Sequence, residues 1–313
     1  MSQIGLETWR GAVGPWHIDQ MGHMNVRFYA AIGMEAMAGL AGALGMPRAF
    51  TAGATSTLAV RDLHIRFLHE ARLAAGLHME CAVLEMGETD ARILQVLFHS
   101  ASGLPAAALT TRVEHLTPHV RRPFPWSSAT RRLAEGVMGA APDYALPRGL
   151  TGDLGLGEPS LARADALGLQ VSASGALSTA DCDVFGLMKP DHVLARISDA
   201  MPHQIDRASL PLKEYMPDLE GHLGGATVEF RARYHRWPQA GDRLVQRSGM
   251  AAVTSKTTRL VHWLLDPAGG EAWTEAEMIT VNLDLQARKA VELPGPIVDI
   301  LKTRLIGAGT AAR

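Results

Sequence analysis

The chain has 313 residues, 47% hydrophobic and 20% charged, with a formal net charge of -2. This length suggests about two globular domains, and so small a net charge gives no reason to expect a nucleic-acid partner or an anionic membrane surface. Two cysteines cannot build a disulfide framework, no CxxC metal spacing occurs, and the first eleven residues lack the features of a secretory signal. We therefore expect a cytoplasmic protein in a reducing compartment.

The first third of the chain predicts a strand, a long helix and four further strands. Residues 9–16 should form the entering strand and residues 26–44 the helix, closed by Gly45 and Pro47. Small residues on every side of this helix suggest that a sheet wraps around it. The expected later strands are residues 57–68, 77–85, 92–99 and 106–117. This order predicts an α+β unit.

The same order recurs after a linker. The linker, residues 126–167, should hold a helix at 127–138 and a crossing rich in proline and glycine. An entering strand at 169–177 and a helix at 190–199 follow, and then strands at 226–234, 243–252, 258–265 and 272–283. The predicted domains are therefore residues 1–125 and 168–313.

Matching residues at a constant spacing indicate a tandem duplication. At a spacing of 164, the paired residues are Asp19 with Asp183, Gly22 with Gly186, Met24 with Met188, and Glu35-Ala36-Met37 with Asp199-Ala200-Met201. At a spacing of 167, they are Arg66 with Arg233, Arg92 with Arg259, and Arg121-Arg122 with Arg288-Lys289.

The turn before the first helix brings a carboxylate, Asp19, close to the free N–H groups of a helix N-terminus. A polarised carbonyl could bind there: Asp19 could act on it as nucleophile or general base, and amides near His23, Met24 and Asn25 could stabilise the oxyanion. One such donor lowers a barrier by about 3–4 kcal/mol. The alternatives are an Asp19 that only caps the turn, a His23 packed under the helix, and an Asn25 that caps the helix.

The pattern Asp-x-x-Gly-His-x-Asn-x-x-x-Tyr, from Asp19 to Tyr29, resembles the turn of hot-dog fold thioesterases, in the 4-hydroxybenzoyl-CoA and acyl-ACP thioesterase group. The sequence Asp181-Cys182-Asp183-x-x-Gly resembles the same turn in the second repeat. The resemblance implies two tandem hot-dog units, each a long antiparallel sheet wrapped round a central helix. In that family two units pair, and the thioester lies at their interface with its carbonyl near the helix N-terminus.

The resemblance also implies catalytic roles for Asp19 and Asp183, and His23 matches the histidine of the acyl-ACP branch. Two departures limit the match. The acyl-ACP enzymes have an asparagine where this chain has Met21, and the second repeat has Leu187 and Lys189 in the places of His23 and Asn25. One working site and one binding or packing site would fit this difference.

The sequence-level hypothesis is an acyl-CoA thioesterase that needs no cofactor and no metal, since no HExxH spacing occurs. Substrate contacts are expected from Gly22, Met24 and Asn25 at the carbonyl. Phosphate contacts are expected from Arg121, Arg122, Arg288 and Lys289, because arginine suits phosphate. Glu35 and Asp199 should make polar contacts at the repeat interface rather than act in catalysis.

Three rival functions remain at this stage: an acyl-ACP thioesterase, a hot-dog hydratase, and an acyl-CoA-binding protein without activity. A further option is association into homodimers of double hot-dog units.

Overall fold

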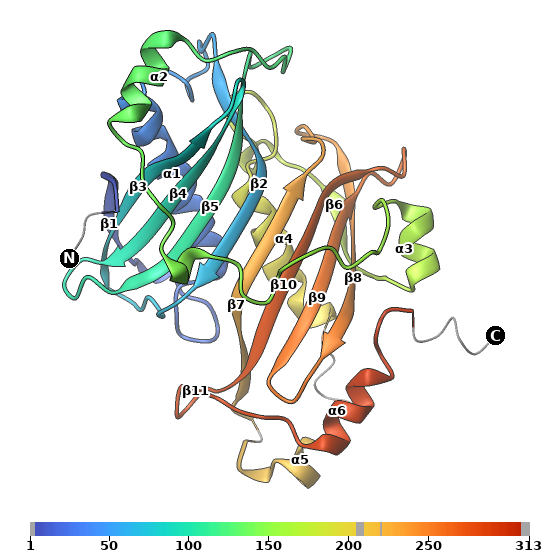
Figure 1. The fold of residues 1–313 in the computed structure, drawn as a ribbon. Coiled ribbons are helices and arrows are strands. Elements are labelled where there is room, and N and C mark those ends of the chain that lie inside the picture. Colours follow the sequence, from blue (N-terminus) through green and yellow to red (C-terminus); the bar gives the residue numbers. More distant parts are fainter. Residues whose placement is uncertain (1–3, 205–209, 220, 308–313) are drawn as a thin grey trace. The chain divides into compact units, whose positions relative to one another are not determined.

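The structure is a computed structural model that describes residues 4–204, 210–219 and 221–307. The chain forms two compact units (Figure 1). The N-terminal unit comprises Met1–Pro147 together with Ser178–Leu194, and the C-terminal unit comprises Arg148–Leu177 together with Ala195–Arg313. The start of the second repeat, Ser178–Leu194, therefore packs with the first repeat.

The N-terminal unit is a five-stranded antiparallel sheet around one long helix. Its elements are β1 (Leu6–Ala12), α1 (Val26–Ala43), β2 (Thr57–Phe67), β3 (Gly76–Met86), β4 (Asp90–His99), β5 (Pro105–Leu116), α2 (Ser128–Glu135) and the 3-10 turns Pro15–His17, Asp143–Ala145 and Thr179–Asp181. The strand order is β1-β3-β4-β5-β2. The helix and the four later strands confirm the prediction. The predicted entering strand was placed too late, because Pro15 cannot donate to a strand ladder and begins a turn instead.

Helix α1 packs closely against the sheet at Gly33. Gln95 Nε2 on β4 donates to the Gly33 carbonyl at 2.6 Å, and Thr111 Oγ1 on β5 donates to Gln95 Oε1 at 3.2 Å. A Cβ atom on Gly33 would lie 2.8 Å from Leu109 Cδ2. A glycine at this position therefore lets the helix backbone reach the sheet, as its small residues predict.

The C-terminal unit has the same architecture. Its elements are β6 (Gln170–Ala176), β7 (Leu223–Tyr234), β8 (Arg243–Val253), β9 (Thr257–Leu265), β10 (Ala272–Asp284), β11 (Lys289–Ala290), α3 (Leu161–Leu167), α5 (Leu212–Tyr215), α6 (Gly295–Lys302) and the 3-10 turns Met201–His203 and Pro217–Leu219. The strand order is β7-β10-β9-β8-β6, with β11 paired to β10. Helix α4 (Asp191–Ala200) begins in the N-terminal unit, and its last six residues belong to the C-terminal unit. The sequence did not predict α3.

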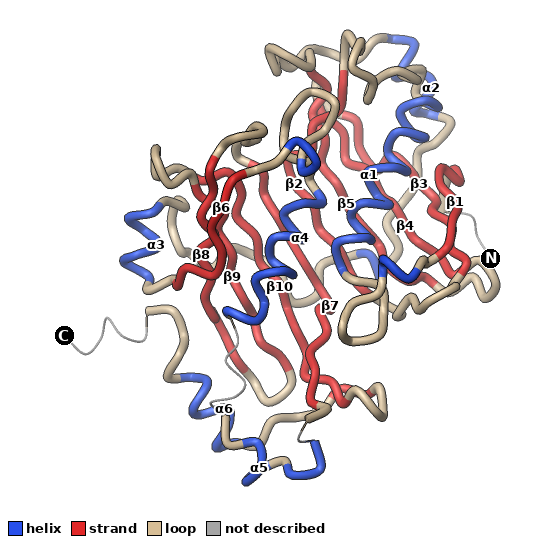
Figure 2. Tube along the Cα trace, turned by 180° about the vertical axis from the view of Figure 1, so that it is seen from behind, coloured by secondary structure: helices blue, strands red, loops and turns tan. Residues whose placement is uncertain are grey.

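The linker covers the outer faces of the strands. Ala145 packs on Leu94 and Val96 in the N-terminal unit. In the C-terminal unit, α3 packs on alternate β9 residues, Val261, Trp263 and Leu265. Because strand side chains alternate, the residues between them, His262 and Leu264, face the inner side, where the central helix lies (Figure 2).

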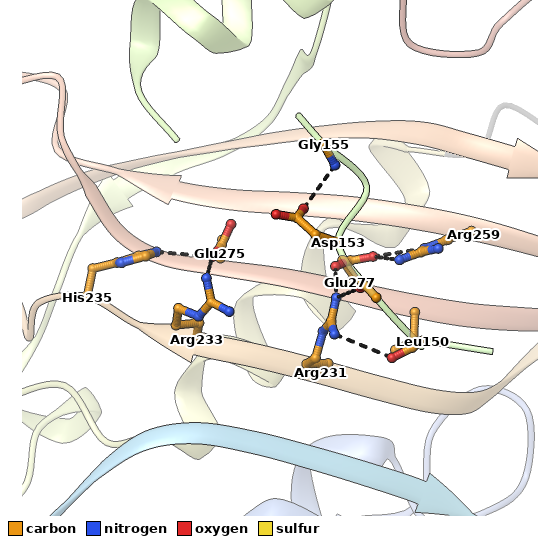
Figure 3. Close-up of polar contacts among 10 residues, drawn as sticks. Leu150, Asp153, Gly155, Arg231, Arg233, His235, Arg259, Glu275 and Glu277 are labelled. Carbon is orange, nitrogen blue, oxygen red and sulfur yellow. Dashed lines mark hydrogen bonds and ion pairs between the residues drawn. The ribbon is translucent and has the colours of Figure 1, made fainter. Parts of the chain in front are cut away.

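Buried and partly buried charges tie the linker to β7. The Glu229 carboxylate accepts hydrogen bonds from the Arg148 and Gly149 amides at 2.9 and 2.6 Å. Arg231 donates to the Gly152 carbonyl at 2.9 Å. It also donates to the Leu150 carbonyl at 3.4 Å and pairs with Glu277 at 2.6 Å (Figure 3). These contacts fix the crossing over the sheet and leave the inner face to the helix. Within the described residues, no helix is long and apolar enough to cross a membrane.

Candidate active site

Backbone hydrogen bonds close the turn before α1, residues 17–25, which we call turn one. The Asp19 amide donates to the His23 carbonyl at 3.0 Å, and the Gly22 amide donates to the Asp19 carbonyl at 3.0 Å. The Met21 amide donates to Asp19 Oδ1 at 2.8 Å. Gly22 has a φ of 77°, a left-handed conformation that favours glycine.

Turn two, residues 181–189, repeats this pattern bond for bond. The Asp183 amide donates to the Leu187 carbonyl at 2.7 Å, the Gly186 amide to the Asp183 carbonyl at 3.0 Å, and the Phe185 amide to Asp183 Oδ1 at 2.8 Å. Gly186 has a φ of 79°. The spacing of 164 residues read from the sequence therefore corresponds to one turn built twice.

Turn one carries an imidazole between two carboxylates. His23 Nε2 lies 3.7 Å from Asp19 Oδ2, and His23 Nδ1 lies 3.2 Å from Glu70 Oε1. The side chains of His23, Asp19 and Glu70 are 11%, 20% and 31% exposed, so water reaches the group without surrounding it. Such an arrangement can hold and transfer a proton.

The loop after β2 positions Glu70, which the sequence analysis missed. The Met24 amide donates to the Ala71 carbonyl at 2.8 Å, and the Ala71 amide donates to Tyr29 Oη at 3.3 Å. Two residues of the turn pattern, Met24 and Tyr29, therefore fix the loop so that Glu70 faces His23. No spacing within the pattern pointed to Glu70, because it lies 47 residues after His23.

The N-terminus of α1 corrects one expectation. The Met24 and Asn25 amides donate to the carbonyls of Ala71 and His17, both at 2.8 Å, so they are not available as the expected oxyanion donors. Asn25 Oδ1 accepts from the Arg27 amide at 3.0 Å and caps the helix, which confirms the alternative role for Asn25. The Val26 amide has no hydrogen-bond partner among the described residues.

Asp183 has different surroundings from Asp19. Its Oδ1 accepts from both the Phe185 and Leu187 amides, at 2.8 and 3.1 Å, and the residue is exposed. Leu187 stands where the first repeat has His23, so turn two has no imidazole beside this carboxylate. Asp183 therefore stabilises its own turn.

Turn two has a second histidine cluster at other positions. His192 Nδ1 lies 3.1 Å from Asp181 Oδ1, and His192 Nε2 lies 3.8 Å from Asp191 Oδ2. Burial lowers the pKa of His192, and the Asp191 carboxylate opposes this shift. These residues are not the repeats of Asp19 and His23, since 164 residues before His192 lies Phe28.

The two predicted basic pairs occupy equivalent turns. Arg121 and Arg288 have left-handed φ values of 52° and 54°. Burial and the neighbouring Arg61 lower the pKa of Arg121 to about 10, against the opposing charge of Asp183. Both arginines are half-buried, whereas their neighbours Arg122 and Lys289 are exposed. Only the second member of each pair therefore faces solvent freely.

The remaining predicted positions are the two helix acids, Glu35 and Asp199. Glu35 Oε2 accepts a hydrogen bond from Trp9 Nε1 at 2.7 Å, inside the N-terminal unit, and Asp199 is exposed. The described residues contain no cluster of histidine, cysteine and carboxylate side chains that could hold a metal ion.

Comparison with known proteins agrees with this architecture. The model of the thioesterase-like superfamily matches residues 13–133 and 177–301. No curated protein sequence is significantly similar to the chain.

Solved structures with the same tandem fold cover most of the chain. The 12:0-ACP thioesterase of Umbellularia californica aligns with a TM-score of 0.61 and 13% identity, over 89% of this chain and 94% of its own. An acyl-ACP thioesterase of Bacteroides thetaiotaomicron aligns with a TM-score of 0.56 and 13% identity, over 87% of this chain and 96% of its own. A Lactobacillus plantarum protein named as a candidate oleoyl thioesterase aligns with a TM-score of 0.66 and 12% identity, over 89% and 97%. At these identities the likeness establishes the fold, the predicted tandem pair of hot-dog units.

Proposed function

Because the chain belongs to the thioesterase-like superfamily, we propose that it hydrolyses acyl-CoA thioesters at turn one. The observation that carries this proposal is the group Asp19–His23–Glu70 directly before the N-terminus of α1. The group offers a base, an oriented imidazole and a helix end, which are the requirements for attack on a thioester carbonyl.

Asp19 is the proposed nucleophile or general base. As a base, it takes a proton from water while the oxygen attacks the carbonyl carbon. As a nucleophile, it forms an anhydride that water then cleaves. Either route ends in a free acid and CoA, and the thiolate is a good leaving group that needs no metal.

His23 and Glu70 orient the attacking group. With Glu70 accepting from Nδ1–H, the Nε2 lone pair faces the space beside Asp19. A water molecule there can donate one proton to Asp19 and the other to His23 Nε2, which would aim its oxygen at the substrate.

The Val26 amide is the proposed oxyanion donor. It is the first amide inside α1, its hydrogen bond is unused among the described residues, and the positive end of the helix dipole adds to its effect. Gly22, the other carbonyl contact proposed, has no atom within 4 Å of the place where a Cβ would stand, so substrate can approach its backbone.

Arg122 and Lys289 are the proposed phosphate contacts, because they are the exposed members of the two basic pairs. Two of the structural relatives are named for acyl-ACP, a carrier that presents the same thioester. Acyl-ACP is therefore the alternative substrate, and the carrier has to be tested directly.

The test is thiol release from a panel of acyl-CoAs and acyl-ACPs by the wild type, Asp19→Asn and Asp183→Asn. Asp19→Asn should lower kcat at least about 10³-fold, and the matched variant Asp183→Asn should stay within a few-fold of wild type. Thiol release from acyl-ACP alone would change the substrate to the carrier protein. Tight binding of both thioesters without any release would overturn the hydrolase and favour a binding protein.

A further inference from the structure

The inner face of the C-terminal sheet carries a patch of five buried polar side chains. Its members are Ser172, Gln246, Ser248, His262 and Thr274, each at most 5% exposed. On β8, β9 and β10, Gln246 and Thr274 both pair with Leu264, and Ser248 pairs with His262. Cross-strand partners share one face, so these side chains point to the same side of the sheet.

Half of the patch is satisfied internally. Gln246 Nε2 donates to Ser172 Oγ at 3.0 Å, Ser172 Oγ lies 2.8 Å from Ser248 Oγ, and Ser248 Oγ lies 2.9 Å from His262 Nδ1. These bonds hold the ring of His262 and the amide of Gln246 in fixed orientations.

The other half has no partner. Gln246 Oε1, His262 Nε2 and Thr274 Oγ1 are buried and make no hydrogen bond within the described parts of the chain. A buried polar atom without a partner destabilises a protein. Three of them on one patch need an explanation beyond the described residues.

The first repeat shows that the fold does not require polar side chains at the positions of Gln246 and Thr274. At a spacing of 167, the positions of Gln246 and Thr274 hold Met79 and Ala107, which are apolar. The position of His262 holds Gln95, whose amide bonds the Gly33 carbonyl of α1 and the Thr111 hydroxyl.

A change in the helix accounts for the unpaired histidine nitrogen. Ile197 stands where the first repeat has Gly33, at a spacing of 164, and its side chain is fully buried. A side chain there keeps the helix backbone from the close approach that Gly33 permits. The Ile197 carbonyl accepts from Gln204 Nε2 at 3.4 Å, and His262 Nε2 remains without that partner.

The chemistry of the patch selects a neutral ligand. All five side chains are uncharged, since burial lowers the pKa of His262 to about 3 and keeps its ring neutral. Buried neutral donors and acceptors favour a hydroxyl group over a charged one, whose desolvation they could not offset. Water and an alcohol share this chemistry.

We propose that this patch binds a hydroxyl group on the acyl chain of the substrate, and so makes the protein selective for hydroxyacyl thioesters. The inference rests on the proposed function, because a thioester substrate brings an acyl chain that needs a buried site. The inner face of the N-terminal unit is closed by the Gly33–Gln95 contact.

The experiment measures binding without turnover, in an Asp19→Asn background. Isothermal titration compares unsubstituted acyl-CoA with acyl-CoAs of the same length whose hydroxyl position varies. We expect one hydroxyl position to bind at least about tenfold more tightly than the parent, since a site built for a hydroxyl rejects the analogue that lacks it.

The diagnostic variant is Gln246→Met with Thr274→Val, which keeps side-chain size and removes two unpaired groups. It should abolish the preference for the hydroxyl and raise the melting temperature of the unliganded protein. The matched control is Thr57→Val, which removes another buried, unpaired hydroxyl, in the N-terminal unit. That control should raise the melting temperature without changing the preference for the hydroxylated acyl-CoA.

Absence of any hydroxyl preference would overturn the inference and assign the patch to water. A preference that survives the double variant would overturn it equally. These outcomes are independent of the proposed function, because a wild type that binds hydroxyacyl-CoA selectively but releases no thiol would refute only the hydrolase.

Discussion

Glu70 Oε1 lies 3.2 Å from Nδ1 of His23, although 47 residues separate the two in the sequence. Glu70 also pairs through its other oxygen with the exposed Arg72 at 3.3 Å. The contact with His23 makes Glu70 a positioning residue, because the carboxylate fixes the tautomer and the plane of the imidazole.

Glu70→Gln should therefore lower kcat about 10- to 100-fold and leave KM within about twofold. Steady-state thiol release measures both constants. Arg72→Gln is the matched control, and it should change neither constant appreciably because Arg72 contacts only the far oxygen of Glu70. A rise in KM at constant kcat would mean that Glu70 binds substrate instead.

Asp183 should matter for stability and not for catalysis. Its Oδ1 accepts two backbone amides in turn two, so Asp183→Ala should lower the free energy of unfolding by about 1–2 kcal/mol. Asp183→Asn keeps an oxygen acceptor and should lower the free energy of unfolding much less than Asp183→Ala does. Urea unfolding gives the two free energies. A large loss of kcat in Asp183→Asn would show that turn two also works as an active site.

Gly22 and Gly186 form a matched pair of left-handed residues. A Cβ would meet nothing within 4 Å at either position, so the cost of alanine comes from the backbone alone. Gly22→Ala and Gly186→Ala should each destabilise the protein by about 1–2 kcal/mol. Only Gly22→Ala should also lower kcat, since Gly22 positions Asp19. Equal effects on kcat would contradict a single working site.

His262 should make stability depend on pH. Burial holds its folded-state pKa at about 3, well below the value of about 6.5 in an unfolded chain. As pH falls below about 6.5, His262 becomes protonated in the unfolded chain but stays neutral in the folded protein, so the free energy of unfolding decreases. At pH 5 the loss is about 2 kcal/mol.

His262→Gln, which copies the residue of the first repeat, should remove this loss. Denaturant unfolding between pH 7 and pH 5 would then show a smaller decrease for the variant than for the wild type. Identical decreases would mean that His262 is protonated in the folded protein.

Local patterns were enough to predict most elements. The helix after turn one and all eight long strands that follow the two central helices lie where alternation, small residues and turn residues placed them. The duplication was also visible, because Asp19 and Gly22 recur at one spacing as Asp183 and Gly186, and the structure builds the same turn at both. These features depend on residues close together in the chain, which a sequence displays directly.

The site needed the tertiary structure. Glu70 reaches His23 only because the Met24 amide and the Tyr29 hydroxyl hold a loop that follows a distant strand. The Met24 and Asn25 amides donate to carbonyls that no sequence spacing reveals, so they lose their expected role. The unpaired nitrogen of His262 depends on Ile197, which stands where the first repeat has Gly33. The sequence by itself determined the duplication, the turn and the order of strands, because these follow from local backbone and side-chain preferences. Which polar atoms find a partner was decided only when segments far apart in the chain packed together.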